Sequence, residues 1–514
     1  MTTTTRMNTA AALILAPLCL WVLSACSDST GTATPVSGLA SKDTAVEVAA
    51  LPQTTWAGSQ SIVLDGDVGE WPEGIAAVAD AQWLYLRFKI DGPLRTLQGM
   101  DTPMSVWIDV DGDPRTGRSI TEPAIEGGLG ADLEIIFSPR EPDAPRVGQG
   151  VMFRVHRPDG TARVVPHERL GFSFTPTHAA EWYEARLSRH AFSELGLKPS
   201  DRISGVVVLH DGRGEVSAWA DPFAVEAPAL EPRRLADARV PSKPAGAVRV
   251  LSWNVEHTSP AKNPDPFARV IRVLDPDVML FQEWIEGDAD AIRAWLIAHV
   301  DDGTQWHVLK GRAWGIAVAS KHPLSTLTPM DPPSPTGGNN PLRFLGALAQ
   351  TPSGPLAVGS THLKCCGTYG SREDQTRMAE AQAIASLLVQ ALGQTPGSQA
   401  WGVVIGGDMN LVGSRPPLDT MGKGVDLDGS DLSIAHAMIL GDNAMYTWFD
   451  PGSAFTPGRL DFLLHSNAMT DAANAFVLDT SKLSEAALAR LGLDTTDTAA
   501  SDHLPVVLDL RPKR

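Results

Sequence analysis

Cysteine and positive charge are both scarce in this sequence of 514 residues. Four Cys residues are too few for a disulfide-rich scaffold. The 42 Lys and Arg residues face 60 Asp and Glu residues, which gives a formal net charge of −18. Proteins that coat polyanions without sequence preference need surplus Lys and Arg, so the composition argues against that class. An enzyme that holds a phosphate through a bound cation stays possible, because the cation supplies the missing positive charge.

The sequence also has no membrane-length apolar segment. Residues 10–23 form an apolar run behind Arg6, but the run is shorter than the roughly 20 residues that a membrane-spanning helix needs. It resembles the core of a signal peptide. It ends in Leu23-Ser24-Ala25-Cys26, which resembles the lipobox of bacterial lipoproteins, where the Cys is acylated and becomes the mature N-terminus. The alternative is an ordinary secretory signal with a chance cysteine.

The residues after Cys26 refine this prediction. Ser27 stands where an Asp would favour retention in the inner membrane, so an outer-membrane destination is favoured. We therefore predict a lipoprotein signal peptide over residues 1–26. A flexible tether rich in Ser, Thr, Gly and Ala follows over residues 27–50. The protein is expected to be exported and anchored by lipid at Cys26 to the outer membrane or cell surface of a bacterium.

Length and a hydrophobic fraction of 43% indicate a globular protein with more than one domain. A proline-rich segment without apolar periodicity over residues 226–247 predicts a linker. It separates predicted domains at 51–225 and 248–514. Its prolines are Pro228, Pro232, Pro241 and Pro244.

The first predicted domain has the pattern of an all-β sandwich. Residues 83–90 and 104–110 alternate large apolar side chains with smaller or polar ones, and turns rich in Asp and Gly separate such runs. Several short motifs, or phrases of sequence, resemble those of family-9 carbohydrate-binding modules and their wider superfamily. The resemblance implies that this domain binds a sugar or another ligand, or docks other domains. The phrases are Leu64-Asp65-Gly66-Asp67, Trp83–Ile90, Ile108-Asp109-Val110-Asp111-Gly112-Asp113 and Gly130-Ala131-Asp132-Leu133.

Two features of this domain have a functional and a structural interpretation. Asp109, Asp111 and Asp113 have a spacing that suits Ca²⁺, but carboxylates in an Asp/Gly turn also cap backbone N–H groups. The absence of an EF-hand spacing favours the capping interpretation. The second feature is a set of tryptophans that could stack on a sugar or fill the core, and the core is the more common place. These tryptophans are Trp71, Trp83 and Trp107.

From residue 248 onward, strand-like and helix-like stretches alternate, and the predicted strands lead into polar residues. A strong amphipathic helix is expected over residues 373–393. The motifs at strand ends resemble those of the endonuclease/exonuclease/phosphatase superfamily, over about residues 248–510. They are Trp253-Asn254, Gln282-Glu283, Thr361-His362-Leu363, Gly407-Asp408-Met409-Asn410, Arg459-Leu460-Asp461-Phe462 and Ser501-Asp502-His503. The resemblance implies a four-layer αββα sandwich, so the fold class of the whole chain is α+β.

The resemblance also implies a metal-dependent hydrolysis of phosphate esters by direct attack of water. Glu283 is the best single ligand for Mg²⁺ or Mn²⁺, with Asn254 and Asp502 able to add a carbonyl and a carboxylate oxygen. Asp408 would orient or deprotonate the water, and Asn410 would hold the water or a phosphate oxygen.

A His–Asp dyad completes the predicted catalytic set. Asp461 would fix the tautomer of His503, which then either activates water or clamps the phosphate as an imidazolium. His362 would donate to a phosphate oxygen. Each of these residues has a structural alternative, such as a turn or a helix cap, but six motifs in order favour catalysis.

The adjacent Cys365 and Cys366 leave three interpretations open: a vicinal disulfide, a pair of soft metal ligands, or two small thiols. The substrate is open as well. A nuclease or phosphodiesterase is the leading prediction, and a phosphatase or a phospholipase C-like enzyme fits the acidic charge better. A third hypothesis is a non-catalytic glycan-binding surface lipoprotein.

Overall fold

The computed structural model describes residues 53–54, 62–90, 92–120, 128–157, 159–394 and 400–513. The predicted signal peptide, the tether and Cys26 lie outside these residues. Among the described helices, none combines the length and the apolar character that crossing a membrane requires.

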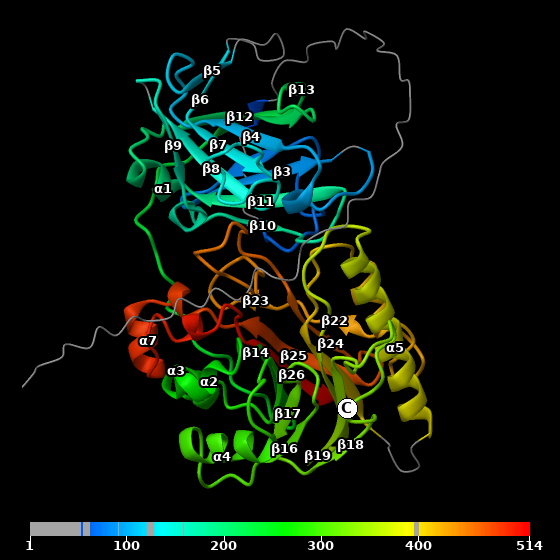
Figure 1. Ribbon diagram of the computed structural model, residues 1–514. Helices are drawn as coiled ribbons and strands as arrows, with labels where there is room; N and C mark the ends of the chain where they lie inside the picture. Colours follow the sequence, from blue (N-terminus) through cyan, green and yellow to red (C-terminus); the bar gives the residue numbers. More distant parts are fainter. Residues whose placement is uncertain are drawn as a thin grey trace, which may run out of the picture. The chain divides into compact units, whose positions relative to one another are not determined.

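The N-terminal region is built from β-sheets, and Figure 1 shows it in blue to green. One sheet has the strand order β1-β13-β12-β4-β7-β8-β9 and the other β10-β11-β3-β2, with a separate hairpin of β5 and β6. The strands are β1 (Gln53–Thr54), β2 (Ala77–Ala79), β3 (Trp83–Lys89), β4 (Met104–Asp109), β5 (Arg118–Ile120), β6 (Leu129–Ala131), β7 (Leu133–Phe137), β8 (Val151–His156), β9 (Ala162–Val165), β10 (Ser173–Thr175), β11 (Trp182–Ser188), β12 (Arg202–His210) and β13 (Val216–Glu226). Short helical segments are η1 (Leu97–Gly99), η2 (His167–Leu170) and α1 (Arg189–Glu194).

Alternation along the strands buries one apolar face of each sheet in a shared core. In β3, Leu84, Leu86 and Phe88 point into this core. The predicted all-β character of this region is confirmed, and the predicted strands at 83–90 and 104–110 match β3 and β4 within a residue. Trp71 and Trp107 are also buried, which agrees with the core interpretation of these tryptophans.

The C-terminal region contains two further sheets packed face to face. One has the order β16-β17-β15-β14-β26-β25-β23 and the other β18-β19-β20-β21-β24-β22. The first sheet contains β14 (Val248–Asn254), β15 (Val278–Gln282), β16 (His307–Lys310), β17 (Ala317–Ser320), β23 (Met438–Ile439), β25 (Thr470–Val477) and β26 (Val506–Pro512). The second contains β18 (Leu324–Thr326), β19 (Phe344–Thr351), β20 (Gly354–His362), β21 (Gly402–Asp408), β22 (Ser433–Ile434) and β24 (Asp461–His465).

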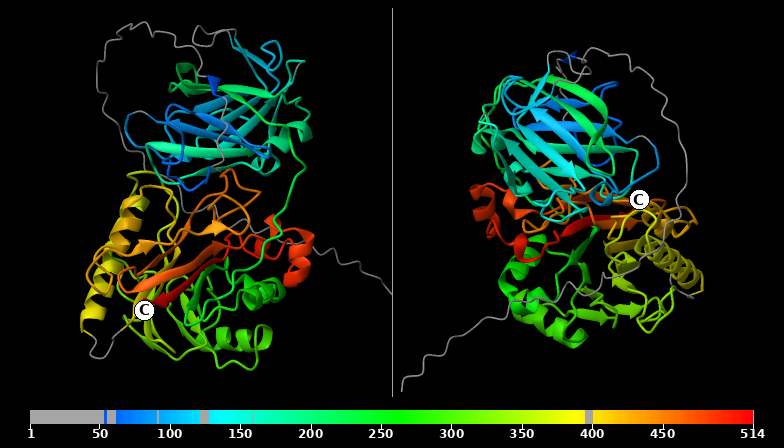
Figure 2. Two further views of the ribbon diagram at one scale, coloured as in Figure 1. Left: turned by 180° about the vertical axis from the view of Figure 1, so that it is seen from behind. Right: turned by 45° about the horizontal axis from the view of Figure 1, so that its top comes forward.

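Helices cover the outer faces of these two sheets, as Figure 2 shows from two directions. Apolar residues of both sheets form the central core. A second cluster packs the first sheet against α3 and α4, and a third packs the other sheet against α5. The predicted four-layer αββα sandwich is thereby confirmed. The helices are α2 (Ser259–Lys262), α3 (Pro264–Leu274), α4 (Ala289–His299), α5 (Arg372–Gln394), α6 (Pro416–Gly422) and α7 (Glu485–Leu491), with η3 (Thr480–Lys482) and η4 (Thr498–Ala500).

The β-sandwich is hydrogen-bonded to three loops of the C-terminal region, and both belong to one packed unit from Ala49 to Arg514. Thr177 donates its hydroxyl to the Leu411 carbonyl at 2.8 Å. Thr96 donates to the Val412 carbonyl at 2.9 Å and accepts from the Tyr369 backbone N–H at 3.0 Å. The buried Arg186 binds Asp442 through Nη2 at 2.7 Å. The sandwich is therefore in direct contact with loops that continue from β20 and β21.

Candidate active site

Strand pairing brings the predicted site residues to one edge of the two sheets. β14 and β15 run parallel, so Asn254 and the residue before Glu283 lie side by side at their ends. β20 and β21 also run parallel and place His362 opposite Asp408, while the antiparallel β24 places Asp461 opposite Asp408. Because parallel strands end at the same edge, residues far apart in the sequence share one site.

A glycine makes the approach of β20 and β21 possible directly before Asp408. Gly407 has a φ of +153°, and a Cβ atom there would lie 1.8 Å from the Thr361 carbonyl oxygen. Any side chain would force the two strands apart. Gly407 therefore sets the distance between His362 and Asp408, whose Nε2 and Oδ2 atoms are 3.4 Å apart.

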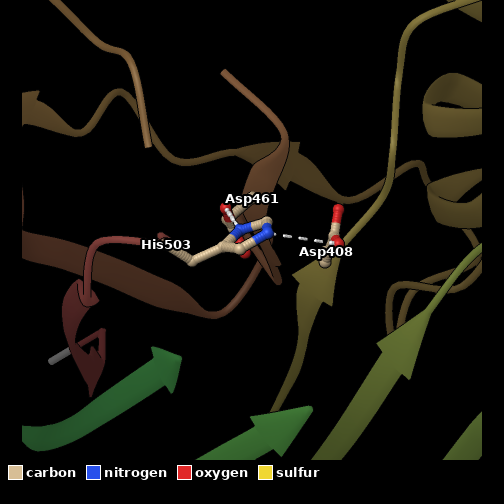
Figure 3. A group of neighbouring side chains, drawn as sticks. All are labelled: Asp408, Asp461 and His503. Atoms are coloured by element: carbon tan, nitrogen blue, oxygen red, sulfur yellow. Dashed lines mark hydrogen bonds and ion pairs between the residues drawn. The ribbon is translucent and has the colours of Figure 1, made fainter. Parts of the chain in front are cut away.

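The His503–Asp461 dyad is formed as the sequence predicted. His503 Nδ1 lies 2.7 Å from Asp461 Oδ2, and both residues are buried. On the other side of the ring, His503 Nε2 lies 3.7 Å from Asp408 Oδ2. Figure 3 shows the imidazole between the two carboxylates. The Thr447 hydroxyl donates to the same Asp461 oxygen at 2.7 Å and accepts from the Asp461 backbone N–H, which fixes this carboxylate.

The charges of this cluster depend on each other. Burial by itself lowers the pKa of His503, but the carboxylates of Asp461 and Asp408 raise it well above its ordinary value. The pKa of Asp408 is raised to about 8, mainly by burial; the charge of His503 opposes the rise, and the charges of Asp461 and Glu283 contribute to it. The raised pKa favours the charged form of His503, and the ionised carboxylate of Asp408 is a stronger base than that of an exposed Asp.

His362 and Asn410 adjoin Asp408 from the second sheet. Burial lowers the pKa of His362 well below its ordinary value, and the nearby Arg343 and His503 act in the same direction. His362 is therefore neutral, and its Nδ1 has no hydrogen-bond partner among the described residues. Asn410 donates from Nδ2 to Asp408 Oδ2 at 2.9 Å and to the Leu363 carbonyl at 3.2 Å. These two residues lie where a group bound at Asp408 would meet neutral donors.

Glu283 and Asn254 are in contact, and the amide of Asn254 has a defined orientation. Asn254 Nδ2 lies 3.2 Å from Glu283 Oε1 and 3.3 Å from Asp408 Oδ2. Its Oδ1 accepts the backbone N–H of Glu256 at 3.1 Å. This oxygen has a second lone pair, so the role of Asn254 as a carbonyl ligand stays a prediction. Asn254 orients Glu283 and Asp408 in this structure, because an amide turned the other way would lose the bond from Glu256.

Asp502 is hydrogen-bonded to two residues outside the sequence motifs, Trp448 and Glu256. Trp448 donates its indole N–H to Asp502 Oδ2 at 2.9 Å, and Glu256 accepts the Asp502 backbone N–H at 3.2 Å. Asp502 Oδ1 is 4.0 Å from His503 Nε2. Trp448 and Thr447 were missed because they belong to no motif, and only the fold places their loop beside Asp461 and Asp502.

The donor set fits a hard divalent cation. Carboxylates of Glu283, Asp408, Asp461 and Asp502 crowd one edge, and oxygen donors of this kind suit Mg²⁺ and Mn²⁺. Asp461 Oδ1 is buried without a hydrogen-bond partner among the described residues. The ligand atoms of Asp408, Asp461 and His503 lie within 4.8 Å of one another. His503 Nδ1 is bonded to Asp461 and Nε2 faces Asp408, so the carboxylates offer the better ligand atoms for a hard cation.

Comparison with known proteins supports the same chemistry. Residues 251–503 match the model of the Endonuclease/Exonuclease/phosphatase family. The match lies in the region that contains the candidate site, and it indicates a phosphoric ester hydrolase. No curated protein matches the chain.

Solved structures that resemble this region include a phosphatase, a sphingomyelinase and a toxin. The 3′ phosphatase NExo from Neisseria, bound to a product DNA hairpin, is 18% identical, with coverage of 51% of this chain and 98% of its own and a TM-score of 0.34. Sphingomyelinase C from Streptomyces griseocarneus is 17% identical, with coverage of 51% and 99% and a TM-score of 0.33. Beta toxin from Staphylococcus aureus with bound magnesium ions is 17% identical, with coverage of 52% and 100% and a TM-score of 0.33.

The acidic cluster of the sandwich differs from the predicted set. Asp109 and Asp111 lie together with Asp132, and their ligand atoms fall within 4.8 Å of one another. Asp113 instead pairs with Arg115 at 2.7 Å. Asp109 accepts the Gly112 N–H and Asp132 accepts the Val110 N–H, as the turn-capping interpretation expects.

Proposed function

We propose that the protein hydrolyses a phosphodiester or phosphomonoester by direct attack of an activated water, with nucleic acids or nucleotides as the leading substrate class. The observation that carries the proposal is the buried line of Asp461, His503 and Asp408 beside Glu283. At one edge of the two sheets, this cluster combines a charged hydrogen-bond donor, a base and a carboxylate that can bind a metal ion. Phosphate-ester hydrolysis needs all three groups.

The proposed steps use residues of this chain. Asp408 orients the attacking water and, in its ionised form, takes its proton; the raised pKa makes this carboxylate a stronger base than that of an exposed Asp. His503, kept charged by Asp461, donates from Nε2 to a phosphate oxygen, and the neutral His362 donates a second hydrogen bond. Asn410 holds the water or a phosphate oxygen. Glu283 and Asp502 would hold a Mg²⁺ or Mn²⁺ ion, which would neutralise charge on the phosphoryl oxygens.

A second candidate is a phosphatase or phospholipase C-like activity on small or lipid phosphates. The net charge of −18 favours it, because the chain lacks the positive field that attracts a long polyanion. The third hypothesis, a glycan-binding lipoprotein without catalysis, is weakened by the burial of Trp71 and Trp107, which removes two of its stacking surfaces. Ca²⁺ binding at the sandwich stays a prediction.

Export and membrane anchoring are part of the proposal and rest on the sequence around Cys26. Globomycin, which blocks lipoprotein signal cleavage, should make a longer precursor accumulate. Cys26→Ala should move the protein out of the membrane fraction. Equal fractionation of the wild type and this variant would contradict the anchor without affecting the catalytic proposal.

The activity test uses bis(p-nitrophenyl) phosphate, p-nitrophenyl phosphate, plasmid DNA and sphingomyelin as parallel substrates. Turnover is expected with Mg²⁺ or Mn²⁺ and should be lost in EDTA. The preferred substrate then separates the phosphodiesterase, phosphatase and phospholipase candidates. No EDTA-sensitive turnover on any of these esters would overturn the catalytic proposal.

A further inference from the structure

Two adjacent cysteines follow the end of β20, outside the set of groups that the proposed hydrolysis uses. Cys365 and Cys366 carry thiols in this structure, and their sulfur atoms lie 3.0 Å apart. A disulfide bond is about 2.05 Å long, so closing one requires the two sulfurs to approach by about 1 Å. Cys366 is exposed to solvent and Cys365 is half-buried, so a small reagent can reach the pair.

The surroundings of Cys365 favour a thiolate. The ammonium of Lys364 lies 3.8 Å from Cys365 Sγ. The thiol of Cys366 donates to the same sulfur, and this bond lowers the pKa of Cys365 to about 6 against the opposing effect of burial, with Lys364 and Arg343 adding to the lowering. A thiolate is the nucleophile in thiol–disulfide exchange, so this sulfur is prepared to react.

The backbone of the pair is held in a fixed conformation. The fully buried Arg377 donates through Nη1 to the Lys364 carbonyl at 2.8 Å and to the Cys366 carbonyl at 2.7 Å. Cys366 has a φ of +69°, in the left-handed region that non-glycine residues seldom adopt. This clamp keeps the two sulfurs on the same side of the loop.

We propose that Cys365 and Cys366 form a thiol–disulfide exchange site whose substrate is a small disulfide or a disulfide-bearing oxidoreductase. The proton between the two sulfurs moves from Cys366 to Cys365, and the exposed Cys366 thiolate attacks one sulfur of the external disulfide and releases the first thiolate. Cys365 gives its proton to that thiolate, attacks Cys366 Sγ, breaks the mixed disulfide and releases the second thiolate. Two protein thiols are oxidised to one vicinal disulfide, and the external disulfide is reduced to two thiols.

The exchange site is connected to the candidate active site through Leu363. The Leu363 N–H donates to the Asp408 carbonyl at 2.9 Å, and its own carbonyl accepts Asn410 Nδ2 at 3.2 Å. Forming the disulfide changes the conformation of the Cys365–Cys366 peptide. Because Arg377 binds the carbonyls of both Cys366 and Lys364, the change is expected to move the Lys364 carbonyl as well. Oxidation is therefore expected to lower hydrolysis several-fold, a consequence that rests on the proposed function, whereas the thiol chemistry does not.

The test treats the reduced full chain, carrying Cys19→Ser and Cys26→Ser so that two thiols remain, with oxidised glutathione. Both thiols should disappear from a dithionitrobenzoate titration without dimer formation, and the intact mass should fall by about 2 Da. Dithiothreitol should restore both thiols. The additional variant Cys365→Ser should stop at a stable glutathione adduct on Cys366, because the resolving thiolate is gone.

The role of the cation is tested by comparing Lys364→Met with Lys423→Met, an exposed lysine elsewhere in the domain. Lys364→Met should slow thiol reaction by about threefold or more, and Lys423→Met should leave its rate unchanged. Persistent reduced thiols, disulfide-linked dimers, or a glutathione adduct that Cys365 never resolves would each overturn the exchange site. Absence of hydrolysis in both redox states would instead count against the proposed function.

Discussion

Each of the two regions of the molecule contains a cluster of three acidic or ligand-forming side chains. The two clusters differ in the groups that form hydrogen bonds to their carboxylates. In the sandwich, Asp109 and Asp132 accept backbone N–H groups of the turn that they close. In the hydrolase domain, Asp461, His503 and Asp408 face one another, and a buried oxygen of Asp461 has no hydrogen-bond partner within the described part of the chain. Carboxylates whose oxygens accept backbone N–H groups stabilise a turn. Carboxylates that are held by other side chains keep oxygen atoms available to bind a ligand or to transfer a proton.

The strongest way to break this comparison is to remove the base of the hydrolase cluster. Asp408→Asn keeps the shape but removes the negative charge, and we expect turnover on bis(p-nitrophenyl) phosphate to fall by about 10³-fold or more. The matched control, Asp428→Asn, changes an exposed turn carboxylate of the same domain and should retain full activity. Turnover of Asp408→Asn within tenfold of the wild type would remove Asp408 from the mechanism.

A smaller effect is expected from the residue that holds Asp461. Thr447→Val removes the hydroxyl that donates to Asp461 Oδ2 and accepts two backbone N–H groups. We expect kcat to fall by about tenfold and stability by about 1–3 kcal/mol. Thr447→Ser retains the hydroxyl and should restore both values. Equal kcat values for the valine and serine variants would show that the hydroxyl does not position the dyad.

In the sandwich, the buried carboxyl group of Glu184 should make the free energy of unfolding depend on pH. Burial raises the pKa of Glu184 to about 8, opposed by hydrogen bonds from Trp71 and Gly66 and aided by nearby Glu70 and Asp65. The folded state therefore holds the proton more tightly than the unfolded state, whose ordinary value is 4.5. The stabilisation is complete below about pH 4.5 and is lost as the pH rises through 8.

Denaturant unfolding at pH 5, 6.5 and 8 measures this effect. The free energy of unfolding should decline over this range, and Glu184→Gln should make the decline smaller by about 2–5 kcal/mol. Glu181→Gln, at an exposed neighbour in the same strand region, is the control and should keep the wild-type profile. Parallel profiles for Glu184→Gln and the wild type would contradict the raised pKa.

The smallest effect is expected at the sandwich cluster itself. Asp132→Asn keeps an oxygen that can accept the Val110 N–H, so hydrolysis should stay within twofold of the wild type. If the carboxylates only close the turn, millimolar Ca²⁺ should move the melting temperature by less than about 1 °C. A larger Ca²⁺ shift that Asp132→Asn abolishes would establish the metal interpretation and give the two clusters a common property.

The sequence predicted much of the hydrolase fold because strand ends carry its motifs. The predicted strand ending at Asn254 matches β14, and the expected helix over 373–393 matches α5 within a residue at each end. The sequence also indicated the His503–Asp461 pair. It did not indicate the direction of the Asn254 amide, because that depends on the Glu256 N–H beside it.

The sequence by itself determined the alternation that builds the sheets and the order of the polar residues that end them. Only the tertiary structure decided which of those residues meet. Thr447 and Trp448 contact Asp461 and Asp502 although 14 and 54 positions separate the pairs, and Asp132 takes the place expected for Asp113. The physical reason is that periodicity fixes which face a side chain occupies, whereas hydrogen-bond partners depend on how separate strands and loops are brought together.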